Sequence, residues 1–531
     1  MSERVRIHLD GRVLEVEAGT SLLAALWNAG VRATRASVTG AGRGPLCGMG
    51  TCFECRVTVD GEPHRRACSE TVRAGMDVRT GATQPASVPL RDGDRREAAV
   101  DALEGEVVVV GAGPAGIAAT VHAAEAGAHP LLIDEAPRAG GQIWRHRADA
   151  PAAARPWLRR LARSGATMLA GATVVDAPSA GTLLVERDGQ PTLVRYRRLV
   201  LATGARELLL PFPGWTLPGV VGAGGAQALL KAGARFDGRR VVVAGSGPLL
   251  LAVAASLRRA GARVVGVVEQ APLARLAAFG LRLGPRRLAE GLALGAGLLG
   301  VHYRTGAWVR EAQGGAGVER VRVSDGRREW SWACDVLACG FGLVPNLELP
   351  RLLGCRAAAD GLALGADQQT SVAGVYAAGE LGGVAGVDHA LASGAVAGTA
   401  AGGRPVPAAL TARRAREARF GARLDAAFAL RAEVLELAAP QTIVCRCEDV
   451  PLGRIDEALA ADSTSPGAAV LPAMTKALKL HTRTGMGACQ GRVCGAALAR
   501  LRGLAVDEVR PPLSPATLGT LAVPTGTEDE P

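Results

Sequence analysis

Two strand–glycine–helix units constrain the fold of this chain more than any other feature. The run VVVVGAGPAG begins just after Glu106, and a second run, VVVAGSGPLLL, begins at Val241. In each run a buried strand leads through a glycine turn into a helix, which is the order of a dinucleotide-binding βαβ unit. Strands and helices alternate from there to about residue 400. This order predicts an α/β fold in which one nucleotide-binding domain is inserted within another.

Composition excludes several other classes of protein. The chain has 531 residues, 48% of them hydrophobic and 3% aromatic, with 70 glycines that follow no repeat. The formal charge of +11 comes mainly from scattered arginines without a nucleic-acid-binding module, so we expect no nucleic-acid partner. No apolar run is long enough for a transmembrane helix, and the N-terminus lacks a secretory pattern. We expect a cytoplasmic protein that reaches a membrane only through partners.

Changes in composition predict the domain boundaries. A hairpin–helix–hairpin pattern of β-grasp order opens the chain, and a polar, proline-containing stretch follows it. An Arg/Ala-rich helical connector separates the nucleotide-binding core from a compact cysteine-containing module. The predicted segments are residues 1–81 (β-grasp domain), 82–104 (linker), 105–402 (two-dinucleotide core, with the second nucleotide unit at about 238–330), 403–440 (helical connector), 441–510 (C-terminal module) and 511–531 (poorly ordered tail).

Four cysteines near the N-terminus have the spacing of a 2Fe–2S cluster: Cys47, Cys52, Cys55 and Cys68. C-x4-C-x2-C followed by a distant cysteine is the plant-type ferredoxin pattern. Gly48 and Gly50 let the loop fold around the cluster. The alternatives are a zinc knuckle or inert thiols. With CGMGTCFECRV and RRAC, the region resembles the small ferredoxin domain of the hydrogen cyanide synthase and heterotetrameric sarcosine oxidase families.

The first glycine loop predicts an FAD site. Gly111 makes the tight turn, Gly113 lets the pyrophosphate approach the backbone, and Gly116 lets the helix pack on the strand. An acid at the end of the next strand should bind the ribose. Glu135 is the predicted residue, and Asp134 is the alternative one position earlier.

Later segments extend this site by resemblance. GGQ at residues 140–142, LVLATGA near residue 203 and VYAAGELGG near residue 379 resemble the FAD half of two-dinucleotide flavoproteins, whose late segment holds the ribityl chain. That family usually has Asp where Glu380 stands. The predicted FAD contacts are Gly111, Gly113, Gly116, Glu135, Gly141, Gln142, Thr203, Gly204, Gly379 and Glu380.

The second glycine loop departs from the pattern at one position. Gly245, Gly247 and the acid Glu269 are present, but Leu250 replaces the third glycine and should push the helix away from the strand. NAD(H), another adenine nucleotide such as ATP, and an unused structural unit all remain open here. Residues 106–330 contain no cysteine, so thiol–disulfide reduction beside a flavin is excluded. The isolated Cys334, Cys339 and Cys355 are expected to be buried, inert thiols.

A second set of four cysteines lies near the C-terminus: Cys445, Cys447, Cys489 and Cys494. The C-x-C and C-x4-C pairs resemble the bacterioferritin-associated ferredoxin-like domain, which implies a second 2Fe–2S cluster. Nearby arginines, Arg446, Arg483 and Arg492, can offset its negative charge. Zinc is the alternative, because four thiolates also suit zinc.

Nearly the whole chain resembles the FAD-containing α subunit of the hydrogen cyanide synthase, octopine/nopaline oxidase and D-hydroxyproline dehydrogenase group, fused to a ferredoxin domain. The resemblance implies an electron-relay subunit whose FAD-dependent β partner oxidises an amine or amino acid of the hydroxyproline, proline, opine, glycine or sarcosine type. Sarcosine oxidase α adds FMN at a subunit interface. The acceptor (quinone, oxygen or a carrier), the substrate and any catalytic residue are unassigned. The alternatives are a self-contained NAD(P)H-dependent ferredoxin-type reductase and an assembly scaffold.

Overall fold

The structure is a computed structural model that describes residues 3–81, 100–463, 476–504 and 509–523. The chain divides into two compact units, each made of three stretches of sequence. Unit 1 contains Met1–Val88, Glu207–Gly342 and Ala426–Asp507, and unit 2 contains Pro89–Arg206, Leu343–Asp425 and Glu508–Pro531. Two short strands, β14 (Ala205–Glu207) and β23 (Leu343–Pro345), lie where the chain passes between the units.

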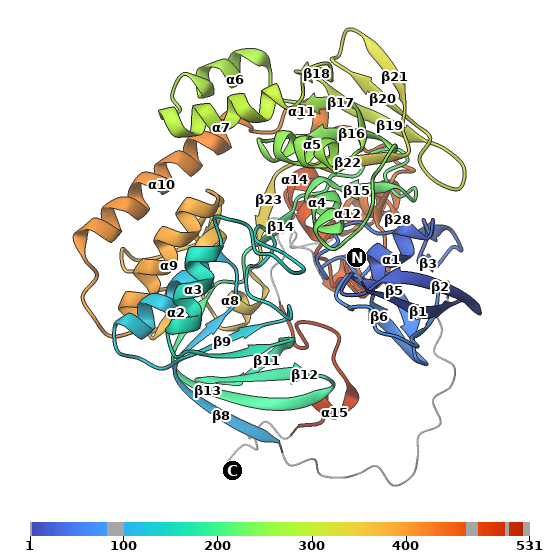
Figure 1. Cartoon of the computed structure of the whole chain (residues 1–531). Helices are drawn as coiled ribbons and strands as arrows, with labels where there is room; N and C mark the ends of the chain where they lie inside the picture. Colours follow the sequence, from blue (N-terminus) through green and yellow to red (C-terminus); the bar gives the residue numbers. More distant parts are fainter. Residues whose placement is uncertain (1–2, 82–99, 464–475, 505–508, 524–531) are drawn as a thin grey trace. The chain divides into compact units, whose positions relative to one another are not determined.

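Unit 2 is built on a mixed sheet of strand order β10-β9-β8-β13-β12-β11, with β26 also paired to β13. The strands β8, β9, β10, β13 and β26 run parallel, and the β11–β12–β13 meander is antiparallel. Helices α2, α3 and α9 lie together beside this sheet (Figure 1). The strands are β8 (Asp101–Val110), β9 (Pro130–Asp134), β10 (Thr167–Ala170), β11 (Ala172–Ser179), β12 (Thr182–Arg187), β13 (Gln190–Leu201), β24 (Ala357–Ala358), β25 (Gly361–Leu362) and β26 (Val375–Ala377).

Small residues allow the helices of unit 2 to pack closely. A Cβ at Gly394 or Gly398 of α9 would lie 2.2 or 2.1 Å from a carbonyl oxygen of α2, so only glycine fits there. Such close helix packing accounts for the many glycines and the few aromatic residues of the composition. The helices are α2 (Pro114–Glu125), α3 (Arg155–Arg163), α8 (Glu348–Leu352), the 3-10 turn η1 (Gly379–Gly382), α9 (Val387–Ala401), α10 (Ala408–Ala427) and α15 (Leu518–Leu521).

Two predicted boundaries of unit 2 need correction. Strand β8 begins at Asp101, inside the segment assigned to the linker, because its exposed first half pairs in parallel with residues 192–196 of β13. The rest of that linker, residues 82–99, lies outside the described residues. The tail predicted to be poorly ordered is partly structured, since Leu513 N donates to Val175 O at 2.7 Å and Val523 is buried. Residues 524–531 lie outside the described part.

The N-terminal part of unit 1 has the predicted β-grasp order. Its sheet runs β2-β1-β7-β5-β6, and the helix α1 packs on one face, capped by Ser21. Asp10 and Asp60 take positive φ in the two predicted hairpin turns. The elements are β1 (Arg4–Leu9), β2 (Arg12–Glu17), α1 (Leu22–Asn28), β3 (Arg35–Ala36), β4 (Gly42–Arg43), β5 (Arg56–Val59), β6 (Glu62–Arg66) and β7 (Asp77–Arg79).

The second nucleotide unit begins earlier than predicted. Its parallel sheet has the order β15-β22-β16-β17-β18, so strands on both sides of residues 238–330 belong to it. A three-stranded sheet, β19-β20-β21, is inserted before β22. The elements are β15 (Val220–Gly222), α4 (Ala223–Lys231), β16 (Arg240–Gly245), α5 (Leu249–Arg259), β17 (Arg263–Glu269), α6 (Leu273–Gly280), α7 (Pro285–Ala296), β18 (His302–Thr305), β19 (Trp308–Gln313), β20 (Arg320–Ser324), β21 (Glu329–Ala333) and β22 (Val336–Gly340).

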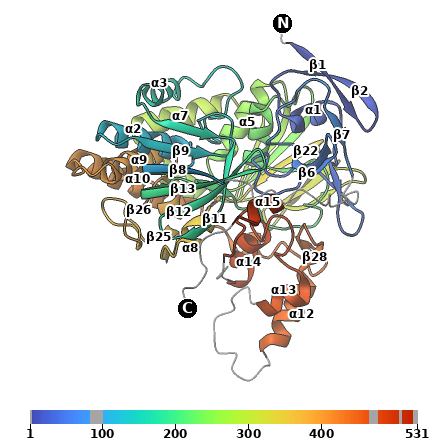
Figure 2. The ribbon, with the colours of Figure 1, turned by 90° about the horizontal axis from the view of Figure 1, so that it is seen from below.

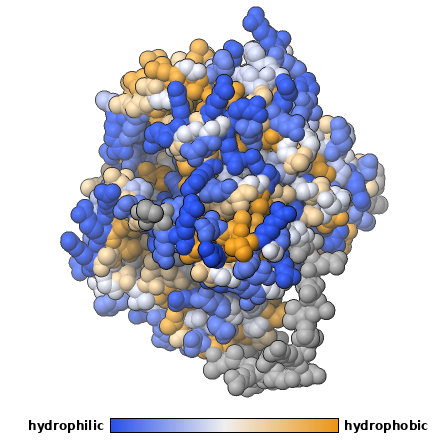
Figure 3. All heavy atoms as spheres, turned by 45° about the vertical axis from the view of Figure 1, so that its right-hand side comes forward, coloured by the Kyte–Doolittle hydropathy of each residue, from blue (hydrophilic) through white to orange (hydrophobic). Residues whose placement is uncertain are grey.

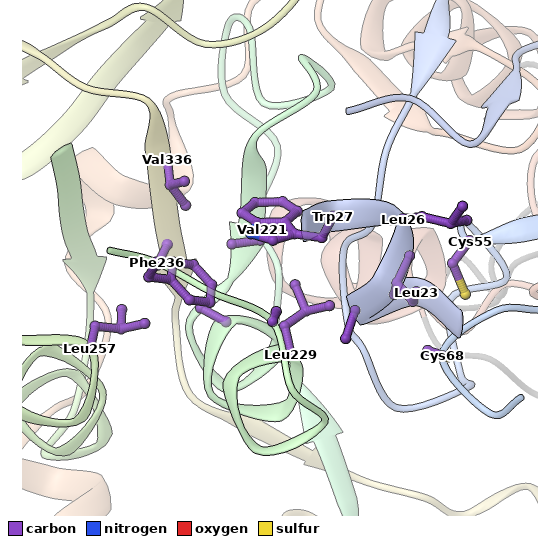
Figure 4. Packing of buried hydrophobic residues seen from close by; sticks show 14 of the residues in the cluster. Leu23, Leu26, Trp27, Cys55, Cys68, Val221, Leu229, Phe236, Leu257 and Val336 are labelled. Carbon is purple, nitrogen blue, oxygen red and sulfur yellow. The ribbon is translucent and has the colours of Figure 1, made fainter. Parts of the chain in front are cut away.

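One continuous core joins the β-grasp domain to the second nucleotide unit. The ring centres of Trp27 in α1 and Phe236 lie 5.4 Å apart with the rings tilted by 40°, and the Trp27 indole nitrogen donates to Arg235 O at 3.0 Å. Figure 4 shows Trp27 of α1 close to Phe236 and to Leu229 of α4, and the buried cluster that contains them also includes Leu23. The two parts of unit 1 therefore share apolar side chains, although the sequence divides them into separate domains.

The third part of unit 1 is the C-terminal cysteine module. Its helices α12, α13 and α14 lie close together (Figure 2). The helices α10 and α11 lie within the connector predicted at 403–440. The elements are α11 (Ala432–Leu435), β27 (Ile443–Cys445), β28 (Val450–Pro451), α12 (Leu452–Ser463), α13 (Lys476–Thr482) and α14 (Cys494–Arg502).

The surface is mostly polar on the face drawn in Figure 3, where blue hydrophilic residues surround smaller orange patches. Among the described residues, no helix is both long and apolar enough to span a membrane.

Candidate flavin and iron–sulfur sites

The first glycine loop leaves room for a ligand at one position. Gly111 has φ +105, and a Cβ there would lie 2.3 Å from Ala202 O; a Cβ at Gly116 would lie 1.7 Å from Gly111 O. These two glycines are therefore required by the fold itself. Gly113 has φ −74, and a Cβ there would meet nothing closer than Gly141 Cα at 3.9 Å. The fold therefore does not require glycine at this position, which is compatible with the predicted approach of a pyrophosphate.

The two acids after β9 have different roles. Asp134 turns back to the glycine loop, where its carboxylate accepts hydrogen bonds from the Ala112 and Ala136 amides. Burial raises the pKa of Asp134 to about 6, although these two amides act in the opposite direction. Glu135 is exposed beside the loop. The geometry therefore favours Glu135 over Asp134 for the ribose contact.

The later predicted FAD segments also belong to unit 2. Gly141 has φ +56, and a Cβ there would lie 2.8 Å from Gly113 Cα, so the GGQ segment crosses directly over the glycine loop. Thr203 Oγ1 donates to Asn346 O at 2.9 Å, next to Gly204. Gly379 N donates to Ser393 Oγ at 2.9 Å. These contacts fix the backbone that surrounds the loop. Gln142 is exposed.

Glu380 makes contacts that its predicted role did not include. Its carboxylate accepts hydrogen bonds from Ala385 N at 2.9 Å and Gly386 N at 3.1 Å. Burial raises the pKa of Glu380 to about 6. The longer acid thus binds the loop before α9. A ribityl contact from Glu380 has to use its remaining lone pairs.

In the second unit the acid predicted to bind ribose, Glu269, lies at the position equivalent to Asp134 and not to Glu135. Strand pairing places Gly245 opposite Glu269, so Glu269 corresponds to Asp134, and Gln270 corresponds to Glu135. Glu269 folds back like Asp134 and accepts from the Gly247 and Ala271 amides, both at 2.8 Å. Burial raises the pKa of Glu269 to about 7. Glu269 and Glu135, the two acids predicted to bind ribose, therefore occupy non-equivalent positions, and a ribose contact from Glu269 stays a prediction.

A segment of the chain itself packs over Gln270, at the corner of the second unit where a bound dinucleotide would place its ribose (the ribose corner). Gln270 is 0% exposed, and its amide nitrogen donates to Ser246 Oγ at 2.9 Å and to the carbonyls of Phe428 and Ala429, both at 3.3 Å. Its amide oxygen accepts from Arg431 N at 3.1 Å, and Ser246 Oγ donates to Phe428 O at 2.9 Å. Residues 428–431, which we call the plug segment, therefore lie across the loop where a dinucleotide ribose would sit.

Leu250 fits this altered loop. It is 2% exposed and packs in the unit 1 core. Helix α5 begins at Leu249, with Pro248 as its N-cap, whereas α2 begins at Pro114, the position equivalent to Pro248. The helix therefore starts one residue later than in the first unit, as a side chain at the third glycine position requires.

The first cysteine set forms two pairs of thiols. All four sulfurs are buried, and the side chains hydrogen-bond as Cys47 with Cys52 and Cys55 with Cys68. The amides of Met49 and Cys52 donate to Cys47 Sγ at 3.4 Å. These hydrogen bonds lower the pKa of Cys47 to about 5, the one from the Cys52 thiol having the largest effect. Two pairs of thiols suit a two-iron cluster, in which each iron takes two protein ligands.

The second cysteine set has the same arrangement. Its buried thiols pair as Cys445 with Cys494 and Cys447 with Cys489. A Cβ at Gly487 would lie 2.1 Å from Cys447 Cβ, so this loop can close only with glycine there. Arg483, which was predicted to offset the charge of a cluster, forms an ion pair with Glu448 at 2.6 Å. Among the described residues, no three His, Cys, Asp or Glu side chains are arranged to hold a single metal ion.

Two groups of functional residues were missed by sequence reasoning. One is the plug segment with Gln270, which has no local signal beyond the register of β17. The other is a set of buried charges between the cysteine loops, in which Glu54 contacts Arg35 and Arg446. The sequence shows Glu54 and Arg446 inside the two cysteine motifs, but it does not show that these two residues contact each other. The other cysteines, Cys334, Cys339 and Cys355, are buried, and burial raises their pKa values, as expected for inert thiols.

Comparison with known families defines the class of protein. Residues 105–396 match the family described as pyridine nucleotide-disulphide oxidoreductase, and residues 2–83 match the 2Fe-2S iron-sulfur cluster binding domain. The chain is therefore a flavin-dependent oxidoreductase with an N-terminal 2Fe–2S domain.

Curated relatives narrow the family. The chain is 35% identical to an opine oxidase subunit of Rhizobium meliloti, over 78% of this chain and 98% of that protein. It is 34% identical to the hydrogen cyanide synthase subunit HcnB of Pseudomonas protegens, over 73% and 89%. A separate match of 43% identity links 14% of this chain to 71% of HcnA, another hydrogen cyanide synthase subunit, from Pseudomonas aeruginosa. The chain belongs to the family that contains this opine oxidase subunit and HcnB.

A solved structure has the same overall fold. The crystal structure of L-proline dehydrogenase from P. horikoshii covers 98% of this chain and 98% of its own, with a TM-score of 0.70 and 20% sequence identity.

Proposed function

We propose that this chain is the electron-transfer subunit of a complex that oxidises an amine or amino acid at a carbon–nitrogen bond. The relatives at 34% and 35% identity are named as subunits of hydrogen cyanide synthase and of an opine oxidase, which supports a separate substrate-oxidising partner. The fused N-terminal domain, similar to HcnA, supports a relay in which two subunits have become one chain.

The observation that carries this proposal is the burial of Gln270 under the plug segment. A self-contained reductase needs NAD(P)H to stack on the flavin, and its ribose needs the corner that Phe428 and Ala429 occupy. With that corner filled by the chain, electrons have to arrive from another donor. The NAD(P)H-dependent reductase is therefore the weaker candidate.

The residues fit the cofactors that this function requires. FAD would lie on the open loop at Gly113, with Glu135 binding the ribose. The first cluster would be held by the N-terminal cysteine set and a second by the C-terminal set. When bound, FAD accepts a pair of electrons and 2Fe–2S clusters take one electron each. The pairwise thiols of Cys445 with Cys494 and of Cys447 with Cys489 support a second cluster rather than zinc. FMN at a subunit interface and a bound ATP remain predictions.

The protein around these sites has three tasks. The amides at the start of α2 would bind the phosphates of FAD. The buried cysteine loops would keep water away from bound clusters, and backbone amides such as Met49 N orient the sulfurs. The substrate class, an amine or amino acid, would be recognised by the partner subunit.

The proposal is tested by reconstitution. The chain alone, mixed anaerobically with proline, hydroxyproline, sarcosine, glycine or an opine, should not reduce a dye, whereas the chain with its amino-acid-oxidising partner should. A matched Cys55→Ser variant should retain flavin but lose relay activity. Dye reduction by the isolated chain with any of these substrates would contradict the proposal.

A further inference from the structure

A buried ion cluster joins the two cysteine loops of unit 1. Glu54, which lies between Cys52 and Cys55, accepts from Arg35 Nη2 at 2.8 Å and from Arg446 Nε at 2.7 Å. Arg446 lies between Cys445 and Cys447. The side chains of Arg35, Glu54 and Arg446 are 3%, 1% and 2% exposed. The loops that carry the two cysteine sets are thus linked through residues adjacent to the proposed ligands.

The guanidinium of Arg446 is fixed on all sides. Its Nη1 donates to Trp215 O at 2.8 Å, and its Cζ lies 4.9 Å from the centre of the Trp215 ring. Trp215 in turn donates from its indole nitrogen to Ile443 O at 2.6 Å, and Arg35 Nη2 donates to Arg446 O at 3.2 Å. These contacts leave the guanidinium one orientation.

A second buried contact holds the same two parts together. Asp449, just after the Cys445–Cys447 loop, binds Arg43 Nη2 at 2.5 Å and Thr39 Oγ1 at 2.6 Å. Phe53, next to Glu54, packs in one apolar cluster with the second cysteine set. The two cysteine loops therefore meet through charged contacts and an apolar contact.

Stability alone does not explain this arrangement. Desolvation of three charged side chains costs about as much as their pairing returns, and apolar residues of similar size would often hold the interface as well. Directional hydrogen bonds between a carboxylate and two guanidinium groups do fix distance and orientation. The cluster of Arg35, Glu54 and Arg446 also leaves one net positive charge beside the two cysteine sets.

We propose that Glu54 and Arg446 are positioning residues that hold the two cysteine sets as fixed neighbours, so that clusters bound there interact magnetically and electrostatically as a pair. The inference rests on the proposed function, because it needs a cluster in each cysteine set. The ligands themselves remain the cysteines.

The first test uses the unmodified holoprotein. Iron and acid-labile sulfide analysis should give about four of each per chain, since each 2Fe–2S cluster holds two irons and two sulfides. The EPR spectrum of the protein with both clusters reduced should then differ from the sum of the two singly reduced spectra, with split lines or faster spin relaxation. About two irons per chain would contradict the second cluster and hence the proposed function. Four irons with simply additive spectra would overturn the positioning inference alone.

The second test uses variants. Arg446→Met and Glu54→Gln should keep about four irons while the magnetic interaction weakens, and the reduction potential of at least one cluster should shift. Arg446→Lys, which keeps the charge but not the planar fork, should restore the potential more than the spin interaction. The exposed pair of Arg65 and Glu62 provides the control variant Glu62→Gln, which should change neither. An unchanged interaction in both Arg446→Met and Glu54→Gln would overturn the inference.

Discussion

In the first dinucleotide unit the residue after the second strand, Glu135, is exposed beside the glycine loop, whereas its counterpart in the second unit, Gln270, is 0% exposed. Both units contain the same strand, turn and helix, and both fold an acid back onto the loop. They differ in the residue at the ribose corner, which is exposed in one unit and buried under the plug segment in the other.

The glycines show the same contrast. Gly113 has an ordinary φ of −74, and a Cβ there would make only an ordinary van der Waals contact with Gly141 Cα at 3.9 Å, so the fold itself tolerates a small side chain at this position. Gly247 has φ +111, which only glycine adopts readily, and so the backbone itself demands it. The same glycine spacing therefore accompanies two different loop backbones, and the glycine motif alone does not show which loop can take a ligand.

The largest expected effect is on flavin content. Gly113→Val should fill the space of the pyrophosphate and lower the bound FAD by about tenfold or more, a factor that corresponds to about 1.4 kcal/mol. The flavin absorbance of purified protein measures this loss. Gly247→Ala is the control, because it should lower thermal stability and leave the flavin content unchanged. Normal flavin in the Gly113→Val protein would place FAD elsewhere.

The next effect concerns NADH. With the ribose corner closed, NADH should bleach the flavin at a rate well below about 1 s⁻¹, the lower end of ordinary turnover. Anaerobic stopped-flow mixing of oxidised protein with NADH gives the rate, with dithionite as the positive control. Bleaching within milliseconds to seconds would mean that the plug segment moves aside, and it would favour the reductase over the electron relay.

A smaller effect should appear in the pH dependence of stability. Burial raises the pKa of Glu269 from 4.5 to about 7, so the native state keeps a proton that the unfolded state has already lost. The contribution of the protonated Glu269 to the free energy of unfolding is fully present below pH 4.5 and is lost as the pH rises to about 7. It amounts to about 3 kcal/mol at most. Glu269→Gln should flatten the change in melting temperature over this range.

Asp134 provides the matched variant in the first unit. Its pKa is raised from 3.8 to about 6, so Asp134→Asn should flatten the curve at lower pH than Glu269→Gln does. Equal pH ranges for the two variants would show that the acids are not folded back in the same way.

The smallest effect separates ribose binding from packing. Gln270→Ala should leave the carbonyls of Phe428 and Ala429 without their buried donor and lower the free energy of unfolding by about 2 kcal/mol, with the flavin unchanged. Glu135→Ala should do the reverse, weakening FAD binding while the apoprotein melts as before. Denaturant titration and flavin release measure the two quantities. A flavin loss in Gln270→Ala would show that the two units are not independent.

Much of the fold could be predicted from local pattern. The glycine motifs identified both nucleotide units, and the alternation of polar and apolar residues gave the β-grasp hairpins with their turns at Asp10 and Asp60. The predictions were weaker where pairing with a distant strand matters. The first residues of β8 are polar and lack periodicity, and only β13 makes them a strand. The tail residue Leu513 is ordered because it pairs with β11, which no local signal in the tail indicates.

The sequence by itself determined which residues are available for chemistry, because cysteine spacing and glycine position act within a few residues of chain. The tertiary structure decided how those residues are used. Gln270 lies more than a hundred residues from Phe428, and Glu54 lies several hundred from Arg446, so their contacts depend on how separate elements pack. Hydrogen bonds and desolvation at such contacts depend on geometry over a few ångströms, and that geometry exists only in the folded chain.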